Sequence, residues 1–176
     1  MEKTLTSKLL HEGRHFSFLR DEVELPNGYR TFRDIVRHPG AVAIVPVLPD
    51  GRVVMVRQYR YAAGKELLEI PAGTLEPGEP VLDCARRELI EETGYEAGKL
   101  EPLLSCYMAP GYSSEVIYFF VASDLREAVG EAEPDEEIAV ERLEPEEVVG
   151  MIAENVIEDA KTIIGVLSLF KETAGS

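Results

Sequence analysis

The stretch 73–95, which reads GTLEPGEPVLDCARRELIEETGY, constrains the fold of this chain more than any other. A turn rich in Gly and Pro leads into one predicted helix. The helix begins near Pro80 and ends at Gly94, because Pro is favoured in a first helical turn and Gly just past a helix end. At about 100° per residue, Glu88 and Glu92 stand one turn apart on one edge. Carboxylates this close repel each other, so the pattern predicts a cation among them.

A divalent metal ion is the obvious candidate for that cation, and a metal held by carboxylates indicates phosphate chemistry. Val81 and Ala85 continue the same line further back, so the two carboxylates are expected beside the packed face of the helix. Glu91 lies one step round, with Arg87 next to it. The alternative is a solvated acidic helix face, which is where most runs of charge lie.

Composition and charge exclude several classes of partner. The 176 residues suit one domain, or a domain with a small extra element. A formal net charge of −15 argues against nucleic acid, because binding a phosphate backbone needs clustered Lys and Arg. With no secretory signal and no apolar run able to span a bilayer, we expect a cytoplasmic protein without a membrane partner. Cys84 and Cys106 are then expected as reduced thiols, a disulfide between them being the alternative.

The first half of the chain alternates apolar and polar residues in the manner of β-strands. Residues 5–38 surround the turn PNG and predict a hairpin. Residues 41–48 and 52–59 flank PDG and predict a second hairpin with buried strands. A short strand at 66–70 is expected to lead into a turn at 71–73.

The second half predicts three more strands and two helices. The strands are expected at 99–106, 115–122 and 137–143, and the helices at 144–155 and 159–172. Asp159 is the expected N-cap of the last helix. The chain is therefore predicted to be α+β, a mixed sheet covered by about three helices with an N-terminal extension of two or three strands.

The stretch 73–95 resembles the signature of the Nudix hydrolases. That signature runs Gly, five residues, Glu, seven residues, Arg-Glu-apolar, one residue, Glu-Glu, one residue, Gly and an apolar residue. Tyr95 departs mildly, since an aliphatic residue is more usual there. The resemblance implies an α/β/α Nudix fold in residues 41–176, with 1–40 as an antiparallel β extension. The matching residues are Gly73, Glu79, Arg87, Glu88, Leu89, Glu91, Glu92 and Gly94.

The resemblance also implies roles for residues of this segment. Glu88 and Glu92, with the backbone oxygen of Ala72, are the implied ligands of Mg²⁺, with Mn²⁺ as the alternative ion. Glu91 is implied as a further ligand or as the group that orients water. Arg87 is expected to hold Glu79 in place through charge-assisted hydrogen bonds.

Two segments outside the signature resemble the ADP-ribose pyrophosphatase group of that family. CYMAPGYSSE (106–115) follows the signature as in that group, although Ala109 stands where Ser is usual, and VRQYR (56–60) matches a Gln-x-Arg at a strand end. The resemblance implies that Arg60 reaches a phosphate and Glu115 the terminal ribose. The alternatives are a simple Pro-Gly turn and a surface arginine.

The N-terminal extension resembles the same group, whose members form homodimers by exchanging it. His15 or Phe16 would then stack on adenine, and Arg33 would contact the ligand from the partner chain. The alternative is that these aromatic residues belong to the core of the hairpin. For the catalytic base the resemblance favours Glu136 on an acidic loop, with Glu133 and Glu137 as rivals and a solvated loop as the alternative.

These residues predict Mg²⁺-dependent hydrolysis of ADP-ribose to AMP and ribose 5-phosphate by a homodimer. One alternative is the same reaction on ADP-glucose or GDP-mannose. Another is a sensor that binds ADP-ribose without turnover, which the intact signature and the lack of a basic domain disfavour. Hydrolysis of damaged nucleoside triphosphates would leave the extension and the Pro110 loop unexplained.

Overall fold

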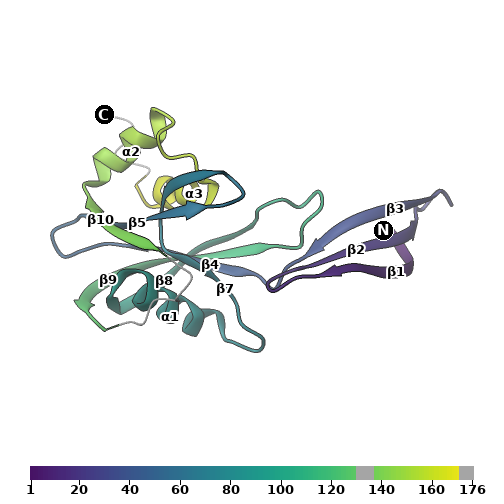
Figure 1. The fold of residues 1–176 in the computed structure, drawn as a ribbon, viewed down its shortest axis with the longest axis horizontal. Helices are drawn as coiled ribbons and strands as arrows, with labels where there is room; N and C mark the ends of the chain where they lie inside the picture. Colours follow the sequence, from purple (N-terminus) through teal and green to yellow (C-terminus); the bar gives the residue numbers. More distant parts are fainter. Residues whose placement is uncertain (130–136, 171–176) are drawn as a thin grey trace.

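The computed structural model describes residues 1–129 and 137–170. In this part of the chain, a body of two sheets and three helices carries an arm of three strands (Figure 1). Figure 1 shows the arm extending to one side of the body, with α1 and the pair α2 and α3 on opposite sides of the sheets.

The arm is an antiparallel sheet in the order β1-β2-β3. Its strands are β1 (Lys3–Glu12), β2 (Ser17–Glu24) and β3 (Arg30–Arg37). The predicted PNG turn joins β2 to β3, with Gly28 at a φ of 80° that side chains rarely adopt. The first predicted hairpin is therefore confirmed, with a third strand added in front of it.

The body contains a mixed sheet and an antiparallel one. The mixed sheet has the order β7-β4-β9-β8, in which β4 and β9 run parallel and the other pairs antiparallel. The second sheet, β10-β5-β6, is antiparallel. The strands are β4 (Ala41–Pro46), β5 (Val53–Arg60), β6 (Lys65–Glu69), β7 (Ala72–Thr74), β8 (Tyr95–Tyr107), β9 (Val116–Glu127) and β10 (Ile138–Leu143).

The second predicted hairpin is wrong, because β4 and β5 lie in different sheets. A single bridge between Val47 and Val53 joins them at the PDG turn. Both hydrogen-bonding edges of β4 are taken by β7 and β9, so β5 has no edge of β4 to pair with. The turn at 71–73 also differs from prediction, since residues 72–74 pair with β4 as β7.

The helices agree closely with prediction. They are α1 (Val81–Thr93), α2 (Pro145–Ala153) and α3 (Ala160–Leu169). Gly94 ends α1 in the left-handed conformation, with φ 70°, and β8 begins at the next residue rather than at 99. The side chain of Asp159 accepts a hydrogen bond from the Thr162 N–H and caps α3 as predicted. The predicted helix end at 171–172 lies outside the described residues.

The strand β4 divides the core into two layers, because alternate residues face opposite sides of a sheet. Val42 and Ile44 pack with Leu89 of α1, whereas Ala43 and Val45 belong to the cluster that includes residues of α2 and α3. All four of these β4 residues are fully buried. The α/β/α arrangement is thereby confirmed, with the sheet layer holding two sheets instead of one.

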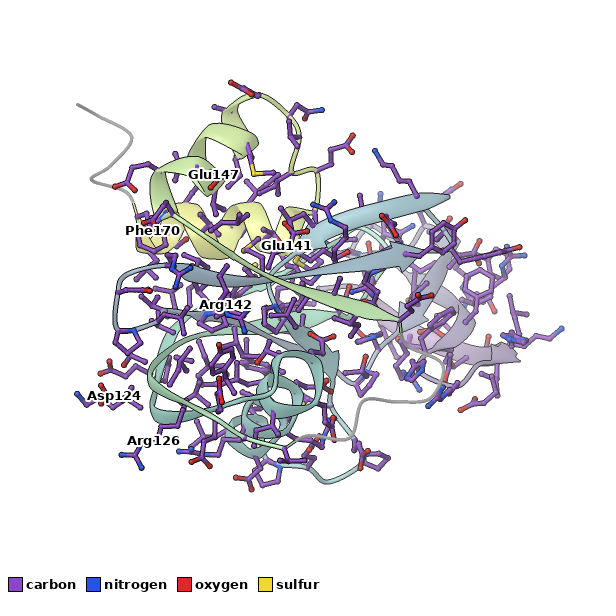
Figure 2. All side chains as sticks on the ribbon, turned by 60° about the vertical axis from the view of Figure 1, so that its left-hand side comes forward. Asp124, Arg126, Glu141, Arg142, Glu147 and Phe170 are labelled. Carbon is purple, nitrogen blue, oxygen red and sulfur yellow. The ribbon has the colours of Figure 1, made fainter. Side chains whose placement is uncertain are left out.

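Polar residues mark the outer ends of the strands. Figure 2 shows Asp124 and Arg126 of β9 projecting away from the body, and both are exposed. On β10, Glu141 accepts a hydrogen bond from Arg57 and Arg142 donates one to the hydroxyl of Tyr95.

No helix in residues 1–129 or 137–170 has the length and apolar character needed to cross a membrane.

Candidate functional site

The candidate site lies where the helix α1 packs closely against the strand β7. The carboxyl group of Glu88 lies against Gly73 so closely that a Cβ there would stand 1.9 Å from its carboxyl carbon. Any side chain at 73 would therefore displace Glu88. Glu92, one turn further along α1, is 6% exposed, and its Oε2 accepts a hydrogen bond of 2.9 Å from the Ala72 N–H. The three predicted metal ligands are thus brought together.

Arg87 lies among the acids of the signature. Its Nε and Nη2 donate to the two carboxylate oxygens of Glu79 at 2.9 and 3.1 Å. Its Nη1 donates to Glu88 at 2.7 Å and to Glu91 at 2.9 Å. The fork from Arg87 lowers the pKa of Glu79 to about 2, and these partners raise the pKa of Arg87. The predicted Arg87–Glu79 frame is present.

Cys84 lies beneath this frame and is fully buried. Burial, together with a hydrogen bond to Glu79, raises the pKa of its thiol to about 12, so it remains protonated at neutral pH. Cys84 and Cys106 are both free thiols, as the sequence predicted.

The donor atoms of this group suit a hard divalent cation. Carboxylate oxygens of Glu88, Glu91 and Glu92 and the carbonyl oxygen of Ala72 are the ligand type that Mg²⁺ prefers. Within the described ranges, no three acidic, His or Cys side chains converge as a closed metal site. The guanidinium of Arg87 supplies positive charge between Glu88 and Glu91 instead. The residues therefore fit the ion in donor chemistry.

A cleft of about 940 Å³ opens beside α1 and β7, within the range of ligand pockets. Its described lining includes four arginines and two of the three histidines of the chain. Four glutamates balance the four arginines, so the lining is less acidic than the chain as a whole, whose net charge is −15, and its arginines offer donors to an anionic ligand. The arginine and histidine residues of the lining are Arg14, His15, Arg37, His38, Arg60 and Arg87, and the acidic ones are Glu12, Glu76, Glu88 and Glu91.

Arg60 lines this cleft and is held from one side. Its Nε and Nη2 donate to the two oxygens of Glu69 at 2.9 and 2.6 Å. Burial alone would raise the pKa of Glu69, but the hydrogen bonds from Arg60 and the charge of Lys161 hold it below its usual value. Gln58, two residues before Arg60 on β5, lines the same cleft. Its buried Oε1 lacks a hydrogen-bond partner among the described residues.

Glu115 approaches the cleft through His38. The Oε1 of Glu115 lies 3.9 Å from the Nε2 of His38, which is one of the lining residues. The Nδ1 of His38 accepts a hydrogen bond from the Gly40 N–H at 3.1 Å, so a neutral ring carries its proton on the side of Glu115. Ser114 accepts from the His38 N–H at 2.9 Å and fixes the loop before β9 to the end of β3.

The remaining predicted site residues fall in three places. His15 and Phe16 lie in the β1–β2 turn and line the cleft of this same chain. Arg33 lies on the arm, paired with Glu2 at 2.7 Å, and does not line the described cleft. Glu133 and Glu136 lie outside the described residues. Glu137 is exposed and is not among the residues that line the cleft.

Several lining residues were not predicted from the sequence. Arg14, Arg37 and His38 come from a segment interpreted only as a hairpin, and Gln58 was noted only as the first residue of the Gln-x-Arg match. Tertiary folding brings all four to the signature helix. Glu69 was also missed as a partner of Arg60. Its signal was available, because a charged residue beside Leu68 and Ile70 in an apolar run is expected to need a buried partner.

Comparisons with known proteins place this geometry among relatives. A methanol dehydrogenase activator of Bacillus methanolicus is 43% identical over 167 residues, 94% of this chain and 90% of that protein. An ADP-ribose pyrophosphatase of Bacillus subtilis (strain 168) is 39% identical over 163 residues, 92% and 88% of the two chains. A solved structure described as an ADP compounds hydrolase superimposes with a TM-score of 0.85 at 25% identity, covering 99% of this chain and 95% of that one.

The family assignment rests on a match to most of the chain. The NUDIX domain pattern matches residues 37–164, which contain the signature helix, β7 and most of the cleft-lining residues. With relatives at 39% and 43% identity over nearly the whole length, the chain belongs to the NUDIX domain family.

Proposed function

We propose that this protein hydrolyses the diphosphate of ADP-ribose to AMP and ribose 5-phosphate, with Mg²⁺ as its cation. The observation that carries the proposal is the cleft, in which the carboxylates of α1 face a group of arginines within a strongly acidic chain. Carboxylates to hold a cation and arginines to hold phosphate are the two elements that cleavage of a diphosphate requires.

The names of the relatives support the choice of ADP-ribose. The Bacillus subtilis relative is an ADP-ribose pyrophosphatase, and the superimposed structure is described as an ADP compounds hydrolase. Both cover at least 92% of this chain, so they match the arm as well as the body. Both names therefore support an adenosine diphosphate group in the substrate, and the name of the Bacillus subtilis relative supports the ribose.

The proposed roles follow from where the residues lie. Glu88, Glu92 and the carbonyl of Ala72 would hold the cation, with Glu91 beside them. When bound, a divalent cation neutralises charge on the diphosphate and lowers the pKa of a nearby water. Arg60 would hold a phosphate, and the buried oxygen of Gln58 would accept a hydrogen bond from a ligand hydroxyl or amine.

Other roles remain proposals from the sequence. Glu136 is the proposed base, with Glu133 and Glu137 as rivals, and Glu115 is proposed to bind the terminal ribose. Phe16 lies where it can stack on adenine, since it lines the cleft and is 47% exposed. We also propose that the protein is a cytoplasmic homodimer joined through residues 1–40. In that dimer, Arg33 would meet a ligand bound to the partner.

The test is a substrate panel of ADP-ribose, ADP-glucose and GDP-mannose, ranked by kcat/KM with Mg²⁺ and with Mn²⁺. We expect ADP-ribose to rank first and AMP to appear as its product. The absence of AMP from ADP-ribose would contradict the proposal, and a higher rank for another sugar would move it to that substrate.

A variant tests the metal assignment separately. Glu92→Gln keeps an oxygen that can accept from the Ala72 N–H but removes the charge, so the fold should survive. We expect kcat to fall by more than about 100-fold, beyond the 10- to 100-fold typical of residues that merely support a metal ligand. Mn²⁺ binding measured by calorimetry should weaken in parallel. The exposed Glu96→Gln serves as the matched control and should retain both.

A second candidate is activation of a dehydrogenase, favoured by the 43% identity to the methanol dehydrogenase activator. Adding the protein to a methanol dehydrogenase separates the two candidates. A rise in dehydrogenase rate that survives Glu92→Gln would indicate activation independent of hydrolysis.

A further inference from the structure

The end of β5 carries an arginine whose direction is set by another strand. In the antiparallel pair of β5 and β6, Glu69 stands opposite Val56, and Arg60 stands opposite Lys65. Arg60 reaches Glu69 by lying back along β5, because the two residues are not cross-strand neighbours. Without that carboxylate, an arginine at a strand end would be free to extend into solvent. Glu69 thus determines where the guanidinium lies.

The hydrogen bonds leave one side of the guanidinium available to the cleft. A guanidinium carries five N–H donors in a planar fork. Glu69 accepts from Nε and from Nη2, which form one edge of the plane. The N–H groups at the other edge, between Nη1 and Nη2, fit a second bidentate acceptor such as a phosphate. Arg60 lines the cleft that also contains Arg87 and Glu88.

Glu69 is itself held firmly by the start of α3. It is 1% exposed and also accepts from Lys161, whose side chain is 11% exposed and lies 3.1 Å from Asp159. The Ile70 N–H donates to the hydroxyl of Thr162 at 2.9 Å, which fixes the backbone next to Glu69. The charges of Glu69 and Asp159 balance those of Arg60 and Lys161, so Arg60 offers a phosphate its remaining N–H donors rather than a net positive charge.

We propose that Glu69 is a positioning residue, which holds one edge of Arg60 so that its other edge binds a phosphate of the nucleotide. The proposal deepens the proposed function and rests on it for the diphosphate ligand. Lys161 and the first turn of α3 fix Glu69 and do not touch the ligand. The C-terminal helix thereby supports phosphate binding in a cleft that it does not line.

The test is a double-mutant cycle on ADP affinity, measured by calorimetry, with AMP as the comparison ligand. Loss of a charge-assisted fork is expected to weaken binding by about 10- to 100-fold. Arg60→Met and Glu69→Gln should each lower the affinity for ADP by a similar factor, and should lower the affinity for AMP by less. The double variant should bind ADP no more weakly than Arg60→Met alone, because Glu69 acts through Arg60.

A merely structural role for Glu69 gives a different pattern. In that case Glu69→Gln would lower the affinities for ADP and AMP equally. Its effect would also add to that of Arg60→Met in the double variant. Either result, or unchanged ADP affinity in Glu69→Gln, overturns the proposal. Arg57→Met is the matched control, since it breaks another arginine–carboxylate pair of β5, with Glu141, outside the cleft. It should keep ADP affinity within about twofold.

A further variant keeps the test decisive if Glu69→Gln fails to fold. Arg60→Lys retains the charge but cannot be held by a fork or present a second edge. It should lose as much ADP affinity as Arg60→Met, whereas wild-type affinity would contradict the role of orientation. Because ADP binding is measured, the result is independent of turnover. If the effects of the Glu69 and Arg60 variants on ADP affinity are coupled but ADP-ribose is not cleaved, only the proposed function is contradicted. If ADP-ribose is cleaved but the two effects are not coupled, only the positioning role is contradicted.

Discussion

Gly73 is the residue at which packing and chemistry meet most directly. The atoms that a Cβ would strike belong to the carboxyl end of Glu88, which is flexible, so the side chain can move while the backbone stays. We expect Gly73→Ala to cost less than about 1 kcal/mol of unfolding free energy, which lowers the melting temperature by at most about 2–4 °C. Hydrolysis should fall by about tenfold or more, because the Glu88 carboxylate has lost its position.

Calorimetry for stability and kcat/KM for activity check this prediction. Gly150→Ala is the control for activity, since nothing lies within 4 Å of its Cβ position and α2 does not line the described cleft. Full activity in Gly73→Ala would show that the position of Glu88 against β7 is unimportant.

Glu79 contributes a pH dependence at the residue scale. The hydrogen bonds from Arg87 lower its pKa from 4.5 to about 2 in the folded protein. A depressed folded-state pKa gives stability that is fully present above pH 4.5 and is lost as the pH falls toward 2. Wild type should therefore lose unfolding free energy across this range more steeply than Glu79→Gln. Urea unfolding at pH 6, 4 and 3 measures both, and parallel curves would refute the assignment.

Two helical glycines show how the same substitution acts differently in different elements. Gly150 of α2 has nothing within 4 Å of its Cβ position, whereas a Cβ at Gly165 of α3 would lie 2.8 Å from Ile70 and 3.1 Å from Val45. Gly150→Ala should stabilise by about 0.5–1 kcal/mol, the gain in helix propensity. Gly165→Ala should destabilise by about 1–3 kcal/mol through overpacking.

Chemical unfolding of the two variants measures the pair, each serving as the control for the other. Equal signs would mean that α3 does not pack on the sheet as closely as its contacts indicate. The packing of α3 also bears on the site, because α3 and α1 each hold the 69–74 segment, through Thr162 and Glu92 respectively.

At the scale of the whole molecule, the arm is separate from the core yet contributes to the cleft. Neither buried cluster of the body includes a residue of β1, β2 or β3. The arm also exposes large apolar side chains, among them Leu9 at 53% and Phe32 at 61%. Leu9 pairs with Leu19 and Phe32 with Glu22, so the two side chains lie on opposite faces of the arm and each face offers apolar surface to a partner.

We therefore expect the full chain to sediment as a dimer, and a chain lacking residues 1–36 to fold as a monomer. The truncated chain should also bind ADP-ribose more weakly, since it lacks the turn at 13–16 that lines the cleft. The double variant Leu9→Ser, Phe32→Ser keeps that turn and should shift toward monomer. Analytical ultracentrifugation decides, and a monomeric wild type would end the dimer proposal.

Local patterns predicted most of the elements, because their signals lie within a few residues. Pro80, Gly94 and Asp159 marked helix ends correctly, and PNG marked its hairpin. The pairing of β4 could not be predicted in this way. Strand partners are set by which edges are free in the assembled sheets, and β9 follows β4 by about seventy residues.

By itself, the sequence determined the carboxylate helix, its frame of Arg87 and Glu79, and the family to which they belong. These depend on spacing within residues 79–94, the helix and the turn just before it, which local geometry fixes. Only the tertiary structure decided which residues surround that helix. Arg14, Arg37, His38 and Gln58 reach the cleft, and Glu69 turns Arg60, through contacts between strands that are distant in sequence. Local spacing carries no information on such contacts, because they form only when the sheets and the arm have assembled.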